Sequence, residues 1–132
     1  MKHALALSLL AASLAGCATA ELQQDTTYRV EWIGERPLID RSHLTVVLGK
    51  DGRAYGNAGC NHWFAGYTLQ DERITFNQAA STRKMCAESL MEQEQRFLAM
   101  LGTIQRWDFS PTGQLRLWPA EGKPLALWPE EG

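Results

Sequence analysis

The sequence predicts an α+β fold: a single compact domain in which an antiparallel β-meander packs against one main amphipathic helix. Three observations predict it. Short runs of alternating apolar and polar residues recur between turn signals, as in half-buried strands. Residues 87–101 change to a helical period. The chain of 132 residues is long enough for one domain and short for two.

The first segment of the chain is typical of a leader. Met1–His3 carries positive charge, and residues 4–15 are an apolar run of Ala, Leu and Ser. A signal-peptide core has this length, whereas a membrane-spanning helix needs about 20 apolar residues. The run ends in Leu14–Cys17, which resembles the lipobox of bacterial lipoproteins. We predict a signal peptide over residues 1–16 and lipidation of Cys17. The alternative is an ordinary secretory signal that is cleaved elsewhere.

This predicted anchor gives the mature chain a location. Several acyl chains on Cys17 hold a protein to a bilayer far more firmly than a single chain. Ala18 follows the cysteine, in place of the Asp that commonly retains such lipoproteins in the inner membrane. We therefore expect a monomer at the outer membrane, facing the periplasm. Residues 17–27 are expected to be the lipidated cysteine and a flexible tether, because they are small, polar and aperiodic.

The charge of the mature chain argues against one class of partner. Loss of Lys2 with the leader leaves 12 basic and 15 acidic residues, without a basic stripe or block. Binding to nucleic acid draws on clustered Lys and Arg. We therefore expect no nucleic-acid partner.

Strands begin the predicted domain, which occupies residues 28–132. Tyr28, Val30 and Trp32 alternate with charged residues. Further strands are predicted over residues 43–48, 53–56, 64–69 and 73–76, and, after the helix, over 104–109, 114–118 and 125–128. Turn residues between neighbouring strands favour a meander. The last two strands end in Leu-x-Leu-Trp-Pro and are predicted to be edge strands, because proline cannot donate to a sheet.

The predicted helix carries one unexpected residue. Its apolar positions from Leu90 to Leu101 share one face, and Gly102 is a natural stop. Glu94 falls among these apolar residues, and a buried carboxylate needs a partner. We predict a structural role, in which Glu94 binds the Arg83 segment or the backbone of the turn at residues 59–61. The alternatives are an acid/base role and solvent exposure at the edge of the stripe.

Cys60 and Cys86 form the remaining cysteine pair. In an oxidising compartment two cysteines favour a disulfide. Two free thiols remain an alternative, as does a metal site with His62 and His43, although their spacing matches no strong metal template. Gly59 and its neighbours tolerate positive φ, so this stretch is predicted to be a tight bulged turn that aims Cys60 inward.

Several motifs together resemble a known family. Residues 56–61 (Gly-Asn-Ala-Gly-Cys-Asn), 66–67 (Gly-Tyr), 81–86 (Ser-Thr-Arg-Lys-Met-Cys) and 91–98 look like the META domain of HslJ-like bacterial proteins. The resemblance marks Gly59, Asn61, Arg83 and Glu94 as motif residues. It implies a compact α+β domain, commonly found on envelope lipoproteins and linked by name to stress, with no established catalytic residue or cofactor. Ala87 departs from the pattern, since relatives often carry Pro there.

We therefore expect a non-enzyme that binds or stabilises another envelope component, with no cofactor and no metal. One alternative is a pilot-like assembly factor that holds a peptide or lipid in an apolar groove lined by Trp and Phe. Another is a hydrolase, which would need Glu94, His62 or Ser81 to converge in a cleft. Trp63 and Phe64 are candidates for partner binding, with core packing as the competing interpretation.

Overall fold

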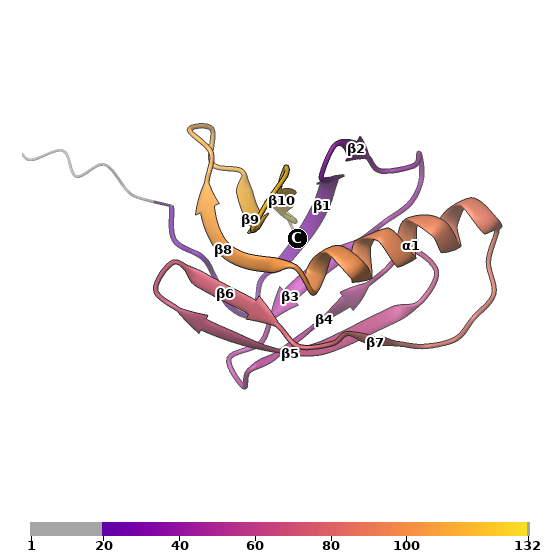
Figure 1. Ribbon diagram of the computed structural model, residues 1–132, viewed down its shortest axis with the longest axis horizontal. Helices are drawn as coiled ribbons and strands as arrows, with labels where there is room; N and C mark the ends of the chain where they lie inside the picture. The colour runs from indigo at the N-terminus through magenta and orange to yellow at the C-terminus, as the bar shows by residue number, and fades with distance from the viewer. Residues whose placement is uncertain (1–19, 132) are drawn as a thin grey trace, which may run out of the picture.

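The computed structural model describes residues 20–131, which form a closed barrel of antiparallel strands with one helix (Figure 1). The elements are β1 Thr27–Ile33, β2 Arg36–Pro37, β3 Thr45–Leu48, β4 Arg53–Asn57, β5 His62–Gln70, β6 Arg73–Phe76, β7 Ala80–Ser81, α1 Glu88–Leu101, β8 Ile104–Phe109, β9 Leu115–Pro119 and β10 Leu125–Pro129. The predicted leader over residues 1–16 and the predicted lipidation site Cys17 lie outside the described residues. No helix within residues 20–131 is long and apolar enough to cross a membrane.

Eight strands make the closed wall of the barrel. Their order is β1, β3, β4, β5, β6, β8, β9, β10, and β10 then pairs with β1. This closing pair runs from Tyr28 opposite Pro129 to Ile33 opposite Leu125. The two-residue strands β2 and β7 add to β1 and β5 respectively. All strand pairs are antiparallel, as expected for strands joined by short turns.

The predicted α+β class is wrong, because the sheet closes on itself and the single helix is a minor element. The alternation within a strand reports which face is buried and carries no information on which strands pair. Closure depends on β1 pairing with both β3 and β10, the latter from the opposite end of the domain. A bulge between Val30 and Trp32 locally bends β1. The predicted edge strands β9 and β10 are also wrong, since each has a neighbour on both sides.

The barrel interior is a filled core. Its largest fully buried side chains include Trp63, Phe97 and Leu residues from four segments of the chain. The rings of Trp63 and Phe97 meet edge to face, with centroids 5.7 Å apart. Fully burying such aromatic side chains contributes about 2–3 kcal/mol each. The interior that an assembly factor would use to hold a peptide or lipid is therefore occupied by the protein's own side chains.

The helix covers one end of this barrel. Since neighbouring strands are antiparallel, the C-terminal ends of β1 and β4 meet the N-terminal ends of β3 and β5 at that end. From α1, the Gln93 side chain accepts a hydrogen bond from the Ile39 N–H at 2.8 Å and donates one to Ser42 Oγ at 3.0 Å. Phe97 and Leu101 are fully buried below it. The helix begins at Glu88, one residue later than predicted, and ends at Leu101 as predicted.

The last residues before β1 differ from the flexible tether that the sequence predicts. Leu22 packs against the core. The Gln23 N–H donates to Tyr28 Oη at 3.0 Å, and Gln24 Nε2 donates to Tyr67 Oη at 2.8 Å. The Asp25 N–H donates to the Leu48 carbonyl at 2.8 Å. Residues 22–27 are therefore fastened to the end of the barrel opposite the helix.

Candidate functional site

The turn between β4 and β5 carries the motif residues Gly59 and Asn61. Gly59 has a φ of 108°, which favours glycine, and its N–H donates to Asn57 Oδ1 at 2.9 Å. The Ala58 N–H donates to the Asn61 carbonyl at 2.7 Å. The sequence predicted that this turn aims Cys60 inward. Instead Asn61 is buried and Cys60 is half-buried, because the turn directs the next side chain toward the helix.

Glu94 is buried beneath the helix and binds this turn. Its Oε1 accepts a hydrogen bond from the Asn61 N–H at 2.8 Å, and its Oε2 accepts one from Asn61 Nδ2 at 2.9 Å. Arg83, the other predicted partner, is exposed. Among residues 20–131 no ion pair involves Glu94. Hydrogen bonds rather than a salt bridge therefore satisfy this buried carboxylate.

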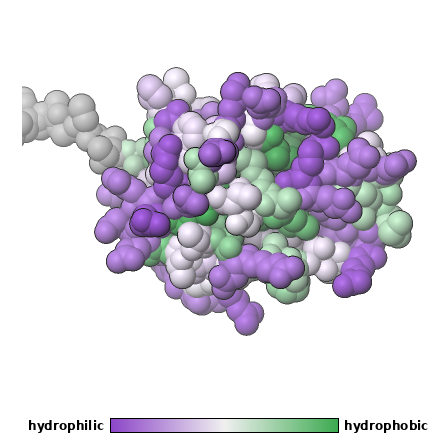
Figure 2. All heavy atoms as spheres, in the orientation of Figure 1, coloured by the Kyte–Doolittle hydropathy of each residue, from purple (hydrophilic) through white to green (hydrophobic). Residues whose placement is uncertain are grey.

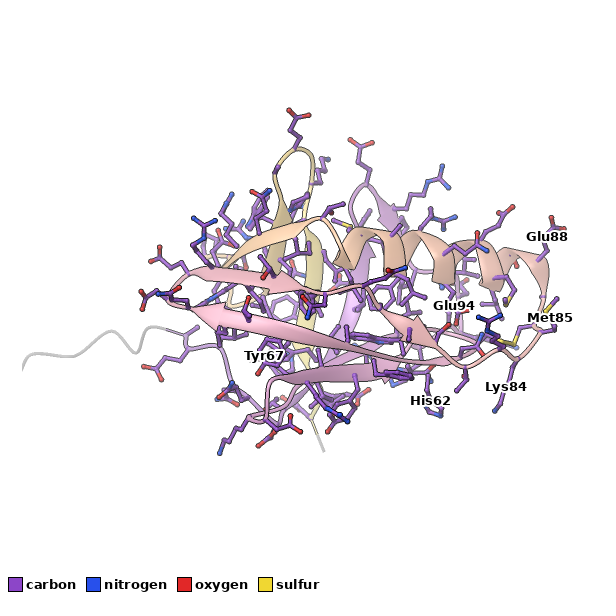
Figure 3. The ribbon with its side chains drawn as sticks, turned by 60° about the horizontal axis from the view of Figure 1, so that its bottom comes forward. His62, Tyr67, Lys84, Met85, Glu88 and Glu94 are labelled. Carbon is purple, nitrogen blue, oxygen red and sulfur yellow. A yellow bond between two sulfur atoms is a disulfide. The ribbon has the colours of Figure 1, made fainter. Side chains whose placement is uncertain are left out.

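Asn61 extends the contact to the segment before the helix. Its Oδ1 accepts hydrogen bonds from Thr82 Oγ1 at 3.0 Å and from the Lys84 N–H at 2.6 Å. Asn61, Glu94, Thr82 and Lys84 form what we call the Asn61 network. It joins the turn, the helix and the segment before the helix at one end of the barrel, where Lys84 and His62 lie at the margin of the molecule (Figure 3). This arrangement fixes a local geometry and leaves neither carboxylate oxygen of Glu94 without a donor.

A disulfide joins the same two segments. Cys60 and Cys86 are bonded, with their Cα atoms 6.0 Å apart and a sequence separation of 26. Cys86 is exposed and Met85, beside it, is 87% exposed. The bond therefore lies at the surface, next to the buried Asn61 network.

The residues that a hydrolase would need do not converge. His62 is exposed and its backbone N–H donates to Thr82 Oγ1 at 3.1 Å. His43 precedes Leu44, which bridges Ala58, and its Nε2 pairs with a Glu130 carboxylate oxygen at 3.0 Å. Ser81 lies in β7, whereas Glu94 is turned toward Asn61 beneath the helix. Within the part of the chain that the structure describes, no group of three or more His, Cys, Asp or Glu is placed to hold a metal ion.

The predicted aromatic pair is divided between the core and the surface. Trp63 is 1% exposed and its Nε1 donates to the Thr45 carbonyl at 3.0 Å, so it belongs to the core. Phe64, the next residue, is 55% exposed on the outer wall. This division follows from β5 itself, in which successive side chains point to opposite faces. Trp63 is therefore wrong as a candidate for partner binding.

Phe64 has a partner that the sequence reasoning missed. Tyr55 lies directly opposite it on β4 and is 49% exposed. The two rings border a hollow of about 610 Å³ that is also lined by Arg53, Gln78 and Ala80. We call these five residues the aromatic hollow. The alternation of residues 53–56 could have predicted that Tyr55 is exposed, because it places Tyr55 on the same outward face as Arg53.

Comparison with known proteins agrees with the motifs. The META domain family model matches residues 3–132, a range that includes residues 3–16 of the predicted leader. The chain belongs to the META domain family. No curated protein matches it.

Two solved structures share the fold of this META domain. One is described as the NMR structure of the protein from Burkholderia xenovorans; it has a TM-score of 0.70 and 23% sequence identity, over 83% of this chain and 84% of that one. The other, also an NMR structure, has a TM-score of 0.60 and 24% identity, over 79% of this chain and 88% of that one. At these identities the likeness establishes the fold alone.

A second polar cluster of the META domain lies on β8 and β9. Asp108 accepts hydrogen bonds from Arg116 Nε at 2.7 Å, from a terminal nitrogen of Arg116 at 2.8 Å and from Trp118 Nε1 at 2.8 Å. The Arg106 guanidinium lies 4.6 Å from the centre of the Trp118 ring. Burial by itself would raise the pKa of Asp108. The hydrogen bonds from Arg116 and Trp118, with the charges of Arg116 and Arg106, outweigh burial and lower that pKa below its ordinary value.

Arg116→Lys is expected to raise the pKa of Asp108 toward its ordinary value, because lysine keeps the charge and loses the two-pronged bond. In the parent the folded-state pKa lies below the unfolded one. The cluster therefore stabilises the fold above the unfolded pKa, and this contribution is lost as pH falls through the folded pKa. A carboxyl-carbon NMR titration of Asp108 measures the shift. Arg53→Lys, on the distant wall, is the control, and equal Asp108 titrations in both variants would contradict the prediction.

Proposed function

We propose that this META domain is the non-catalytic binding module of an outer-membrane lipoprotein, and that it binds another envelope protein through the aromatic hollow. The observation that carries the proposal is the exposed pair Tyr55 and Phe64, half of whose surface is open to solvent on a wall that is otherwise largely polar. The stress context linked to the family by name favours a role in protecting or stabilising that partner.

The location rests on the leader. The apolar run and Leu14–Cys17 support export and acylation of Cys17, and Ala18 supports transfer to the outer membrane. An exported, oxidising environment also accounts for a disulfide between Cys60 and Cys86 in so small a domain. Each of these features is expected of a periplasm-facing lipoprotein.

The non-catalytic character is supported by the use of the polar residues. Both carboxylate oxygens of Glu94 accept hydrogen bonds from Asn61, and Asn61 Oδ1 accepts hydrogen bonds from Thr82 and Lys84 in the segment before the helix. A general base must reach a substrate proton, and a nucleophile needs an activating base within hydrogen-bond distance. The Asn61 network is built for stability, since its carboxylate is turned toward a neighbouring backbone and amide.

The aromatic hollow has the composition of a protein-binding surface. Aromatic residues and arginine are enriched at the energetic centres of interfaces. Tyr55 and Phe64 supply two adjacent rings, Arg53 supplies a cation, and the Gln78 side chain offers an amide at the rim. On the face seen in Figure 2 the surface is mostly hydrophilic, with small and separate apolar areas. The partner that fits the hollow is a protein segment with an apolar side chain flanked by polar groups.

The test is cross-linking in intact cells. With a photoreactive residue at Gln78, the parent chain is expected to capture a specific envelope protein. Tyr55→Ala with Phe64→Ala should reduce that capture about tenfold or more, because two central aromatic contacts are lost. Quantitative mass spectrometry of the cross-linked material measures the change.

The matched control is Thr68→Ala with Thr75→Ala. These two exposed threonines also lie opposite each other on the outer wall and bond to each other at 2.6 Å. Capture by this control should match the parent, as should the folded state of both variants by circular dichroism. Equal capture by the aromatic and threonine variants would overturn the proposal, as would capture of no envelope protein by the parent.

A further inference from the structure

The attachment of the N-terminal segment limits where the barrel can lie relative to a membrane. Leu22 packs on the core, and residues 23–25 bond to the barrel. Only the few residues between Cys17 and Leu22 can therefore act as a spacer. Whatever their conformation, the three peptide units from Cys17 to Ala20 span at most about 11 Å. An anchor on Cys17 must hold Ala20 within that distance of the bilayer surface.

Ala20 lies against a defined part of the wall. With Glu72 of the β5–β6 turn and residues 106–109 of β8, which include Asp108, it lines a hollow of about 480 Å³. In Figure 1 the described chain enters on the side of β8 and β6, and in Figure 3 the labelled Met85 and Glu88 lie at the opposite end of the molecule. The same wall is therefore the part of the domain closest to the anchor.

We propose that this wall rests on the lipid headgroups of the membrane that holds the anchor. We call it the tether face and define it by Glu72, Arg73, Arg106, Trp107 and Phe109. The inference rests on the acylation of Cys17 in the proposed function. It adds a second contact with the bilayer, made by the domain itself, and commits to anionic phospholipid as the partner.

The side chains of the tether face suit an interface of headgroups. Arg73 and Arg106 are opposite each other on β6 and β8, and the Arg106 side chain is 53% exposed. Its nearest carboxylate oxygen, on Asp108, is 3.8 Å away, because Asp108 accepts its short hydrogen bonds from Arg116 and Trp118. The Arg106 guanidinium stacks on the Trp118 ring, and within the described residues its N–H groups donate no hydrogen bond. They can therefore donate to lipid phosphate, which arginine binds in two-pronged geometry.

Two aromatic residues lie beside these arginines. Trp107 and Phe109 alternate with Arg106 along β8 and pack partly against the core. They are half-buried and meet edge to face, with ring centroids 5.8 Å apart. The Trp107 Nε1 donates to the Asp71 carbonyl at 2.8 Å, which holds the indole at the end of the barrel. Aromatic side chains with an apolar body and a polar end favour the boundary between lipid and water. Glu72 and Asp108 oppose anionic lipid. Arg116 neutralises Asp108, so the net attraction depends on Arg73 and Arg106 outweighing Glu72.

This orientation places the other parts of the domain at defined distances from the membrane. The end covered by α1 points away from the membrane, together with Met85 and the Cys60–Cys86 bond. Phe64 lies in the half of β5 nearer that end, and Tyr55 is opposite it at the middle of β4. The aromatic hollow would therefore face the periplasm, where a second envelope protein can reach it.

Oxidative footprinting of the acylated chain in vesicles tests the proposal. The vesicles contain phosphatidylcholine with phosphatidylglycerol, and the reference is the unacylated Cys17→Ser chain with the same vesicles. Oxidation of Trp107 and Phe109 by hydroxyl radicals is expected to fall several-fold in the acylated chain. Oxidation of Met85, at the far end, is expected to be equal in both chains.

Charge variants separate contact with lipid from mere proximity. Arg73→Gln with Arg106→Gln should return the oxidation of Trp107 toward the unacylated level. Arg83→Gln with Lys84→Gln removes the same charge from the far end and should leave the protection unchanged. Protection of Met85 instead of Trp107, equal effects of both variants, or recovery of the acylated chain outside the vesicle fraction would each overturn the proposal. The vesicles hold no envelope protein, so the result is independent of partner binding.

Discussion

Glu94→Leu is expected to lower the free energy of unfolding by about 3 kcal/mol, because the buried Asn61 N–H loses its acceptor and Asn61 Nδ2 keeps only the Lys84 carbonyl, at 3.3 Å. Glu94→Gln keeps one carbonyl oxygen for the backbone N–H and should cost about 1–2 kcal/mol. Which of the two variants is the more stable is as informative as how much stability each one loses. Leucine is the better helix former and the more apolar side chain. If position 94 contributed only apolar burial, Glu94→Leu would be more stable than Glu94→Gln.

Urea and thermal unfolding of both variants measure these differences. Glu92→Gln is the matched control, since Glu92 lies on the exposed side of the same helix, and its stability should equal that of the parent within about 0.5 kcal/mol. If Glu94→Leu proves as stable as Glu92→Gln, the Asn61 network contributes nothing to stability. If glutamine costs more than leucine, apolar burial of this helix face outweighs the hydrogen bonds that Glu94 accepts.

The position of Glu94 could be predicted from the sequence because both signals are local. A helical period places Glu94 on the apolar side, and the glycine-rich turn supplies unpaired backbone donors at a position that needs glycine. Gln93, its neighbour, is fully buried and was not predicted. Its partners Ile39 and Ser42 lie in an irregular segment, and no pattern in that segment signals that it folds against a helix more than 50 residues later.

Closure of the barrel is the part of the fold that local patterns did not reveal. The predicted strands nearly coincide with the observed ones, since side-chain alternation fixes which face is buried. Whether β10 returns to β1 depends on the twist and bending of the whole sheet, including the bulge in β1. The same limit explains Trp63, because alternation separates it from Phe64 and only the curvature of the sheet decides which face is the interior.

Loss of the disulfide has the other large expected effect. Cys60→Ser with Cys86→Ser should lower the free energy of unfolding by about 3.5 kcal/mol, since the bond closes a loop between positions 26 apart in the unfolded chain. The folded state should keep its shape, because the Asn61 side chain binds Thr82 and Lys84 without help from the sulfur atoms. Denaturation of the oxidised parent and the double variant under identical conditions measures the difference. Equal midpoints would contradict the prediction.

Trypsin distinguishes the two constraints on the segment before the helix, which are the disulfide and the hydrogen bonds of Asn61. Arg83 and Lys84 in this segment are exposed cleavage sites. Loss of the disulfide alone should speed cleavage there only slightly, since Asn61 still holds the backbone of Lys84. Asn61→Ala alone should also leave cleavage slow, because the disulfide still holds Cys86. Only the combined variant should be cut rapidly under native conditions. Rapid cleavage after loss of the disulfide alone would mean that the hydrogen bonds of Asn61 follow from the covalent bond, and that the disulfide orders the native segment as well as restricting the unfolded chain.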